Sequence, residues 1–122
     1  MNSVRIINTT HPLNQQLIVD WRQTFWGRFR GLMFTNSLNS GCGILMDELV
    51  ESILAATIHM MFMNFDIVVV WIDQNKKVVD IKEAKKWALY LSPSRPAQFI
   101  LELHKDRFPD FECGDQLKFE QI

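Results

Sequence analysis

The chain has 122 residues, of which 48% are hydrophobic and 22% charged, which fits one globular domain over residues 1–122 and excludes a disordered or fibrous chain. Thirteen basic and fourteen acidic residues give a net charge of -1, so no strong positive field attracts nucleic acid or an anionic membrane. No secretory signal and no membrane-spanning apolar stretch can be recognised. We therefore expect a cytoplasmic protein that binds neither nucleic acid nor membrane.

The first half of the chain predicts short strands around one helix. Period-two alternation predicts a strand over residues 4–9, and a second strand over 17–21 is expected to pair with it. Residues 24–34 carry apolar side chains at helical spacing, which predicts a short helix. Residues 44–46 read as a short strand. Residues 47–56 fit either a helix face or an irregular connection.

The centre of the chain is the apolar run 57–72. Two of its segments, 57–63 and 67–72, are rich in β-branched and aromatic residues and almost free of charge, which predicts strands buried on both faces. Turn-forming residues follow at 73–76. The alternation over 78–82 then predicts a half-exposed return strand.

The last third predicts two more strands. In residues 98–103, Phe99, Leu101 and Leu103 are expected to face inward while Gln98 and Glu102 face out, and Ile100 is the exception to the alternation. One helical turn is expected over 106–111, and a last strand includes residues 117–119. Strands this short, with connections too short for βαβ units, predict a mainly β (α+β) fold. We expect a single small, mostly antiparallel sheet, barrel-like or sandwich, with one or two short helices.

The two cysteines, Cys42 and Cys113, are each followed by glycine. This spacing matches neither a zinc knuckle nor a CxxC redox pair, so we expect free thiols in a reducing compartment.

Four segments in order carry a family resemblance. They are WGRFRGLMF at 26–34, IHMMFMNFDIVVVWID at 58–73, VVDIKEAKKW at 78–87, and SRPAQFILELHKDRF with a later GDQLKF near the end. Together they resemble the domain of unknown function 192 family over nearly the whole chain. That family has no established activity, so the resemblance implies a fold and an order of motifs rather than a reaction.

The central segment departs from the family pattern. Many members carry FWMKNT followed by Pro-Leu-Asp, where this chain has IHMMFM followed by residues 65–68. Met61 and Val68 stand in the places of the lysine and the aspartate of that pattern, and Asp66 lies two residues away from the second.

Polar turns with arginine suggest a binding site at one rim of the sheet. We expect Trp26, Arg28, Arg30, Trp87 and Arg95 to line an aromatic-floored cleft in which an arginine receives an anion. This hypothesis predicts a binding module for a small molecule or a protein, without a cofactor, that is a monomer or a weak homodimer.

The alternative hypothesis is a small hydrolase-like enzyme that uses His59 with Asp66 or Asp73 for acid–base chemistry. A lone histidine at the start of a buried strand is more often a packing residue. The three methionines near His59 fit core filling better than copper binding, because neighbouring strand positions face opposite ways, and we expect no metal site. The lysines between residues 76 and 86 fit a solvated sheet edge.

Overall fold

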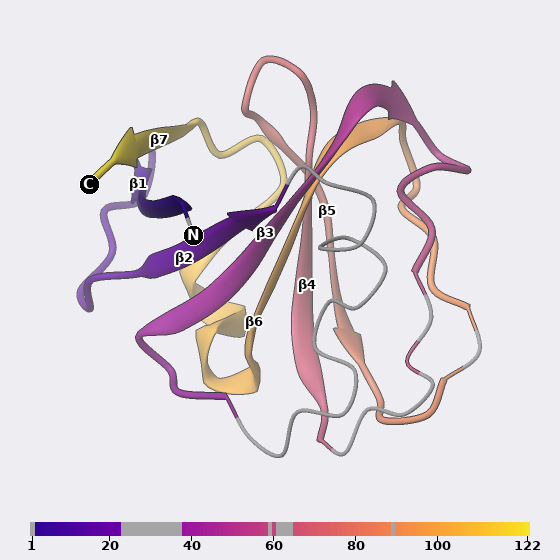
Figure 1. Ribbon diagram of the computed structural model, residues 1–122, viewed down its shortest axis with the longest axis horizontal. Helices are drawn as coiled ribbons and strands as arrows, with labels where there is room; N and C mark the ends of the chain where they lie inside the picture. The colour runs from indigo at the N-terminus through magenta and orange to yellow at the C-terminus, as the bar shows by residue number, and fades with distance from the viewer. Residues whose placement is uncertain (1, 23–37, 59, 61–64, 89) are drawn as a thin grey trace.

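The computed structural model describes residues 2–22, 38–58, 60, 65–88 and 90–122, and Figure 1 shows their arrangement. Within these residues the chain forms strands and one 3₁₀ helix. They are β1 (Asn2–Asn8), β2 (Ile18–Arg22), β3 (Cys42–Ser52), β4 (Ile67–Ile72), β5 (Val78–Ala84), β6 (Ala97–His104), η1 (Lys105–Asp110) and β7 (Leu117–Gln121).

The strands form one seven-stranded sheet in the order β5-β4-β6-β3-β2-β1-β7. Every neighbouring pair is antiparallel except β2 and β3, which are parallel. The strand direction turns progressively across the sheet, so that β1 and β7 lie at a large angle to β4 and β5 (Figure 1). The two edges touch at a single bridge between Lys77 and Gln116, without closing a barrel. The prediction of a mainly β, mostly antiparallel fold is confirmed.

The two predicted hairpins, β1 with β2 and β4 with β5, are present. β1 buries alternate residues such as Val4 and Ile6 and pairs with β2. β4 lies between β5 and β6, and all six of its residues are buried. The carboxylate of Asp73 accepts the backbone N–H groups of Asn75 and Lys77, each at 2.9 Å, which fixes the turn between β4 and β5.

The sheet carries a hydrophobic cluster on each face. In β6, Phe99, Leu101 and Leu103 belong to the first cluster, and Ile100 belongs to the second. The prediction that Glu102 faces solvent is wrong, because this residue is only 5% exposed. Strand alternation predicts exposure only where one face of a sheet is solvated, and both faces of β6 are covered.

Three local predictions need correction or completion. The strand predicted at 44–46 is the longer β3, and residues 53–56 form turns. In the described part of the predicted strand 57–63, only Ile58 forms a β-bridge, to Leu91. The helical turn predicted near the end is η1, whereas the helix predicted at 24–34 lies outside the described residues.

The two ends of the chain lie side by side, because β1 and β7 are paired (Figure 1). Cys42 and Cys113 are exposed and form no disulfide in this structure. Within the residues described, no helix is long and apolar enough to cross a membrane.

Candidate functional site

Charged side chains form a strip across the face of the sheet that carries the second hydrophobic cluster, the one that includes Ile100. Strand register places Glu102 directly between Ile44 of β3 and Val69 of β4. One strand further out, Asp20 lies opposite Ile44 and Lys82 opposite Val69. Side chains at one level of neighbouring strands point to the same face. These three charged residues therefore share the face of the second hydrophobic cluster.

The next level of the strip adds two more charges. At this level Ile100 of β6 lies between Met46 of β3 and Trp71 of β4. On the outer sides, Arg22 of β2 lies opposite Met46, and Asp80 of β5 lies opposite Trp71. We use "charged strip" for the five residues Asp20, Arg22, Asp80, Lys82 and Glu102.

Glu102 is the buried member of the charged strip. Its Oε1 atom is inaccessible to solvent and has no hydrogen-bond partner among the described residues. Desolvation raises the pKa of this carboxyl to about 7, although the charge of Arg22 acts in the opposite direction. Since a buried polar group without a partner is costly, such a group in a native fold calls for an explanation. A carboxyl of this kind can bind a hydrogen-bond donor or exchange a proton near neutral pH.

The other charges of the strip have partners of opposite sign. Arg22 donates from Nε to Oδ2 of Asp20 at 2.9 Å. Nζ of Lys82 lies 3.7 Å from Oδ2 of Asp80. The same ammonium group lies 5.7 Å from the ring centre of Trp71, a cation–π geometry. The charges of the two cations and the two carboxylates thus cancel, and ionised Glu102 gives the charged strip one net negative charge.

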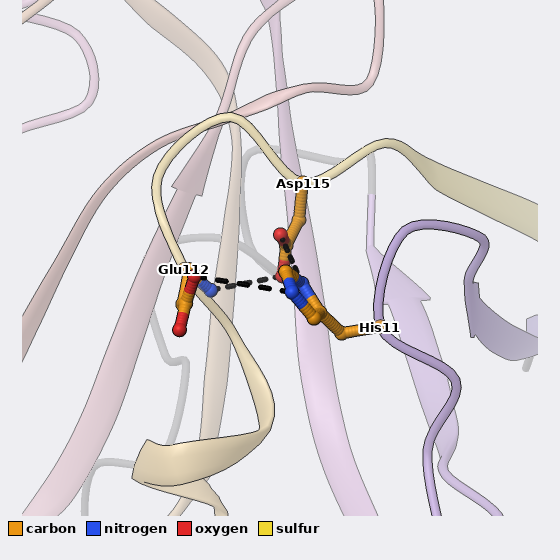
Figure 2. A group of neighbouring side chains, drawn as sticks. All are labelled: His11, Glu112 and Asp115. Atoms are coloured by element: carbon orange, nitrogen blue, oxygen red, sulfur yellow. Dashed lines mark hydrogen bonds and ion pairs between the residues drawn. The ribbon is translucent and has the colours of Figure 1, made fainter.

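A second polar cluster lies where the segment that follows β1 meets the turn before β7 (Figure 2). Nδ1 of His11 lies 2.7 Å from Oδ1 of Asp115, and its Nε2 lies 4.0 Å from Oε2 of Glu112. Asp115 is buried, whereas His11 and Glu112 are exposed.

The buried side chain of Asn8 holds this cluster in place. Its Nδ2 donates to Oδ2 of Asp115 at 2.8 Å, and its Oδ1 accepts the backbone N–H groups of Thr10 and His11. Burial alone would raise the pKa of Asp115, but hydrogen bonds from Asn8, from the backbone N–H of Glu112 and from His11 lower it overall. Asp115 is therefore an anion at neutral pH.

A cavity of about 430 Å³ lies beside this cluster, between β1 and the segment that leads to β2. Its wall includes Asn8, Pro12, Leu13 and Arg5. The guanidinium of Arg5 is paired with Glu120. The cavity is therefore mainly an apolar recess, and it offers less chemistry than either polar cluster.

The structure describes two of the five residues of the predicted rim; Trp26, Arg28 and Arg30 lie outside the described residues, as does His59. Trp87 and Arg95 are both exposed. The rim as a whole stays a prediction.

The positions of these two residues follow from the hydrogen bonds beside them. The residue before Trp87 donates its backbone N–H to Asp66, which directly precedes β4. The residue before Arg95 donates its N–H to Asp80, which lies opposite Trp71 near the other end of β4. From Asp66 to Trp71 the extended strand rises roughly 16 Å. The segments that carry Trp87 and Arg95 are therefore anchored near opposite ends of β4.

The two acidic residues considered with His59 also lie at opposite ends of β4. Asp66 accepts the backbone N–H of Lys86 at 2.7 Å and lies 3.8 Å from Nζ of Lys85. Asp73 orders the turn into β5. Both carboxylates therefore have a structural role, and one histidine could approach only one of them.

The reasoning from sequence missed Glu102, His11 and Asp115. The position of Glu102 within an apolar run could have indicated a buried carboxylate, but period-two alternation predicted that its side chain faces solvent. No local signal connects His11 with Asp115, because 104 positions separate them. Only the pairing of β1 with β7 brings these two residues together.

Comparisons with known proteins agree with the resemblance. The family model DUF192, described as "Uncharacterized ACR", matches residues 6–119. A UPF0127 protein of Thermococcus kodakarensis is 42% identical over 97 residues, which cover 80% of this chain and 60% of that protein. A UPF0127 protein of Thermococcus gammatolerans is 36% identical over 117 residues, covering 94% of this chain and 74% of that protein. The chain thus spans less than two thirds of the first of these relatives.

A solved structure supports the fold. It is a Sinorhizobium meliloti protein, named as a proposed transcription regulator, with a TM-score of 0.81 at 20% identity over 97% of this chain and 92% of that one. At this identity the likeness shows the fold alone. With a family model matched over residues 6–119, the chain belongs to the DUF192 family of uncharacterised proteins.

Proposed function

We propose that the protein is a binding module for a small amine with an apolar body, and that the carboxylate of Glu102 receives the ammonium group. The observation that carries this proposal is the buried Oε1 of Glu102, which has no hydrogen-bond partner among the described residues. A protonated amine supplies the missing donors and a charge of opposite sign.

Two further features of the site support this ligand class. The charged strip carries one net negative charge when Glu102 is ionised, since Arg22 and Lys82 are matched by Asp20 and Asp80. A single positive charge on the ligand would therefore balance the strip. Glu102 is flanked by apolar neighbours in the second hydrophobic cluster, which favours an aliphatic or aromatic body next to the amine.

The test compares amines with their uncharged counterparts. Benzylamine, butylamine and agmatine are titrated against the full chain and followed by thermal unfolding and calorimetry, with benzyl alcohol and butanol as controls. At a ligand concentration 100-fold above Kd, mass action adds about 2.7 kcal/mol of stability. We expect stabilisation by at least one amine and none by the alcohols.

Two variants with the same net charge locate the site. Glu102→Gln removes the buried carboxylate, and Glu83→Gln removes an exposed one from β5, the edge strand on the other side of β4. Amine binding should be lost in Glu102→Gln and unchanged in Glu83→Gln. An equal response of the two variants, or no response of the wild-type chain to any amine, would show that the proposal is wrong.

The hydrolase-like alternative, with His59 and either Asp66 or Asp73, has less support. Both carboxylates already accept backbone N–H groups in turns. We also propose a cytoplasmic location and a monomeric or weakly dimeric state. The two exposed cysteines without a disulfide suit a reducing compartment.

A further inference from the structure

The cluster of His11, Glu112 and Asp115 (Figure 2) combines one imidazole with two carboxylates from two distant chain segments. One potential ligand atom of each residue lies within 4.8 Å of the others. Carboxylates alone suit Mg²⁺ or Ca²⁺, whereas an added imidazole shifts the preference toward transition metals. We propose that these three side chains bind one divalent transition-metal ion such as Zn²⁺, Ni²⁺ or Co²⁺.

The buried residue of this cluster is already oriented as a ligand. Oδ2 of Asp115 accepts hydrogen bonds from Asn8 and from the backbone N–H of Glu112. Its Oδ1 is thereby directed at His11. Asn8 also fixes the backbone of His11. Metal ligands in proteins are usually held by such an outer layer of hydrogen bonds, and here one buried amide orients two of the three ligands.

The distances in the cluster fit a metal ion after a small adjustment. Two ligands about 2.1 Å from the ion are about 3.0 Å apart at the right angle of an octahedral site and about 3.4 Å apart at the angle of a tetrahedral site. Nδ1 of His11 and Oδ1 of Asp115 are 2.7 Å apart, so the ion takes the place of the proton that they share, and that proton goes to solvent. Glu112 supplies the third ligand by rotation of its side chain, which is 74% exposed.

The site is open to water on one side. The side chain of His11 is 53% exposed, whereas that of Asp115 is 2% exposed. An ion held there reaches the ligands from solvent and completes its coordination with water. This metal site lies apart from the charged strip, so it does not depend on the function proposed above.

The experiment titrates Ni²⁺ and Zn²⁺ into the full chain near neutral pH and measures binding by calorimetry. His11→Gln and Glu112→Gln each remove one exposed ligand and leave the buried Asn8–Asp115 pair in place. The matched control is His104→Gln, because His104 also faces a carboxylate, with Nδ1 3.5 Å from Oδ2 of Asp106. Circular dichroism verifies that the variants are folded.

We expect one ion per chain in the wild type and in His104→Gln, with affinity at least about 10-fold weaker in His11→Gln and Glu112→Gln. Co²⁺ should broaden the amide resonances of residues 8–11 and 112–115 in the wild type. Equal affinity in all four proteins, broadening centred on His104, or no stoichiometric binding at millimolar metal would each overturn the proposal.

Discussion

The buried side chains of Asn8 and Asp115 are joined by a hydrogen bond of 2.8 Å across 107 positions of sequence. Asn8 ends β1, and Asp115 lies in the turn that precedes β7. The bond therefore joins the end of β1 to the turn before β7. This turn also lies beside the start of β5. The backbone bonds from Val78 to Asp115 and from Gly114 to Val78 complete this junction.

Replacement of Asn8 by alanine should lower the free energy of unfolding by roughly 2 to 3 kcal/mol, because it leaves a buried carboxylate and two backbone N–H groups short of a partner. Urea denaturation measures the change. Asn2→Ala, at the exposed start of the same strand, serves as the control and should stay within about 0.5 kcal/mol of the wild type. Equal effects of the two substitutions would contradict the junction role of Asn8.

The lowered pKa of Asp115 predicts a loss of stability in acid. Burial opposes the ionised form, but the hydrogen bonds from Asn8, Glu112 and His11 outweigh it, so the folded pKa lies below the ordinary value of 3.8. The stabilising contribution is then present above the unfolded pKa and disappears as pH falls through the folded pKa. Denaturation curves between pH 6 and pH 2 should show a steeper loss for the wild type than for Asp115→Asn. Parallel curves would speak against this linkage.

The raised pKa of Glu102 should make stability depend on pH in the opposite direction from the lowered pKa of Asp115. Its folded pKa of about 7 lies above the ordinary value of 4.5, so its favourable contribution is complete below about pH 4.5 and is lost as pH rises through 7. At pH 8 the ionised group costs about 3 kcal/mol. Glu102→Met, of similar volume in an apolar setting, should therefore be more stable than the wild type at pH 8.

The pH profile of Glu102→Met separates this explanation from ordinary repacking. The gain in stability should be largest at pH 8 and small at pH 5, where the wild-type carboxyl is protonated. A gain that does not change with pH would mean that packing rather than charge is responsible. A gain in stability accompanied by loss of amine binding is typical of a residue retained for function.

The strands could be predicted wherever local patterns carry the information. The apolar β4 and the turn at Asp73 depend on neighbouring residues, and both were predicted correctly. The prediction that Glu102 faces solvent was wrong, because the alternation of apolar and polar residues along a strand does not show whether both faces of that strand are covered. The pairing of β1 with β7 and the parallel pairing of β2 with β3 depend on distant parts of the chain. The polar clusters depend on these pairings, so their residues could not be brought together from spacing alone.

The approach of β3 to β6 beside Glu102 depends on Gly43. A Cβ atom at this position would lie 2.7 Å from the backbone oxygen of Glu102 and 2.6 Å from Cδ2 of Leu103. The leucine can rotate, but the backbone oxygen belongs to a central strand pair and cannot move without loss of pairing. Gly43→Ala should therefore cost about 1 to 3 kcal/mol through overpacking.

Gly41→Ala is the matched control for this substitution, because its added Cβ would meet its nearest neighbour, the side chain of Asn39, at 3.4 Å. Urea denaturation should place Gly41→Ala within about 0.5 kcal/mol of the wild type. Since Gly43→Ala also displaces the strand that carries Glu102, it should weaken amine binding, whereas Gly41→Ala should leave it unchanged. If Gly43→Ala binds amines as the wild type does, the close contact of β3 with β6 is a requirement of the fold and not of the site.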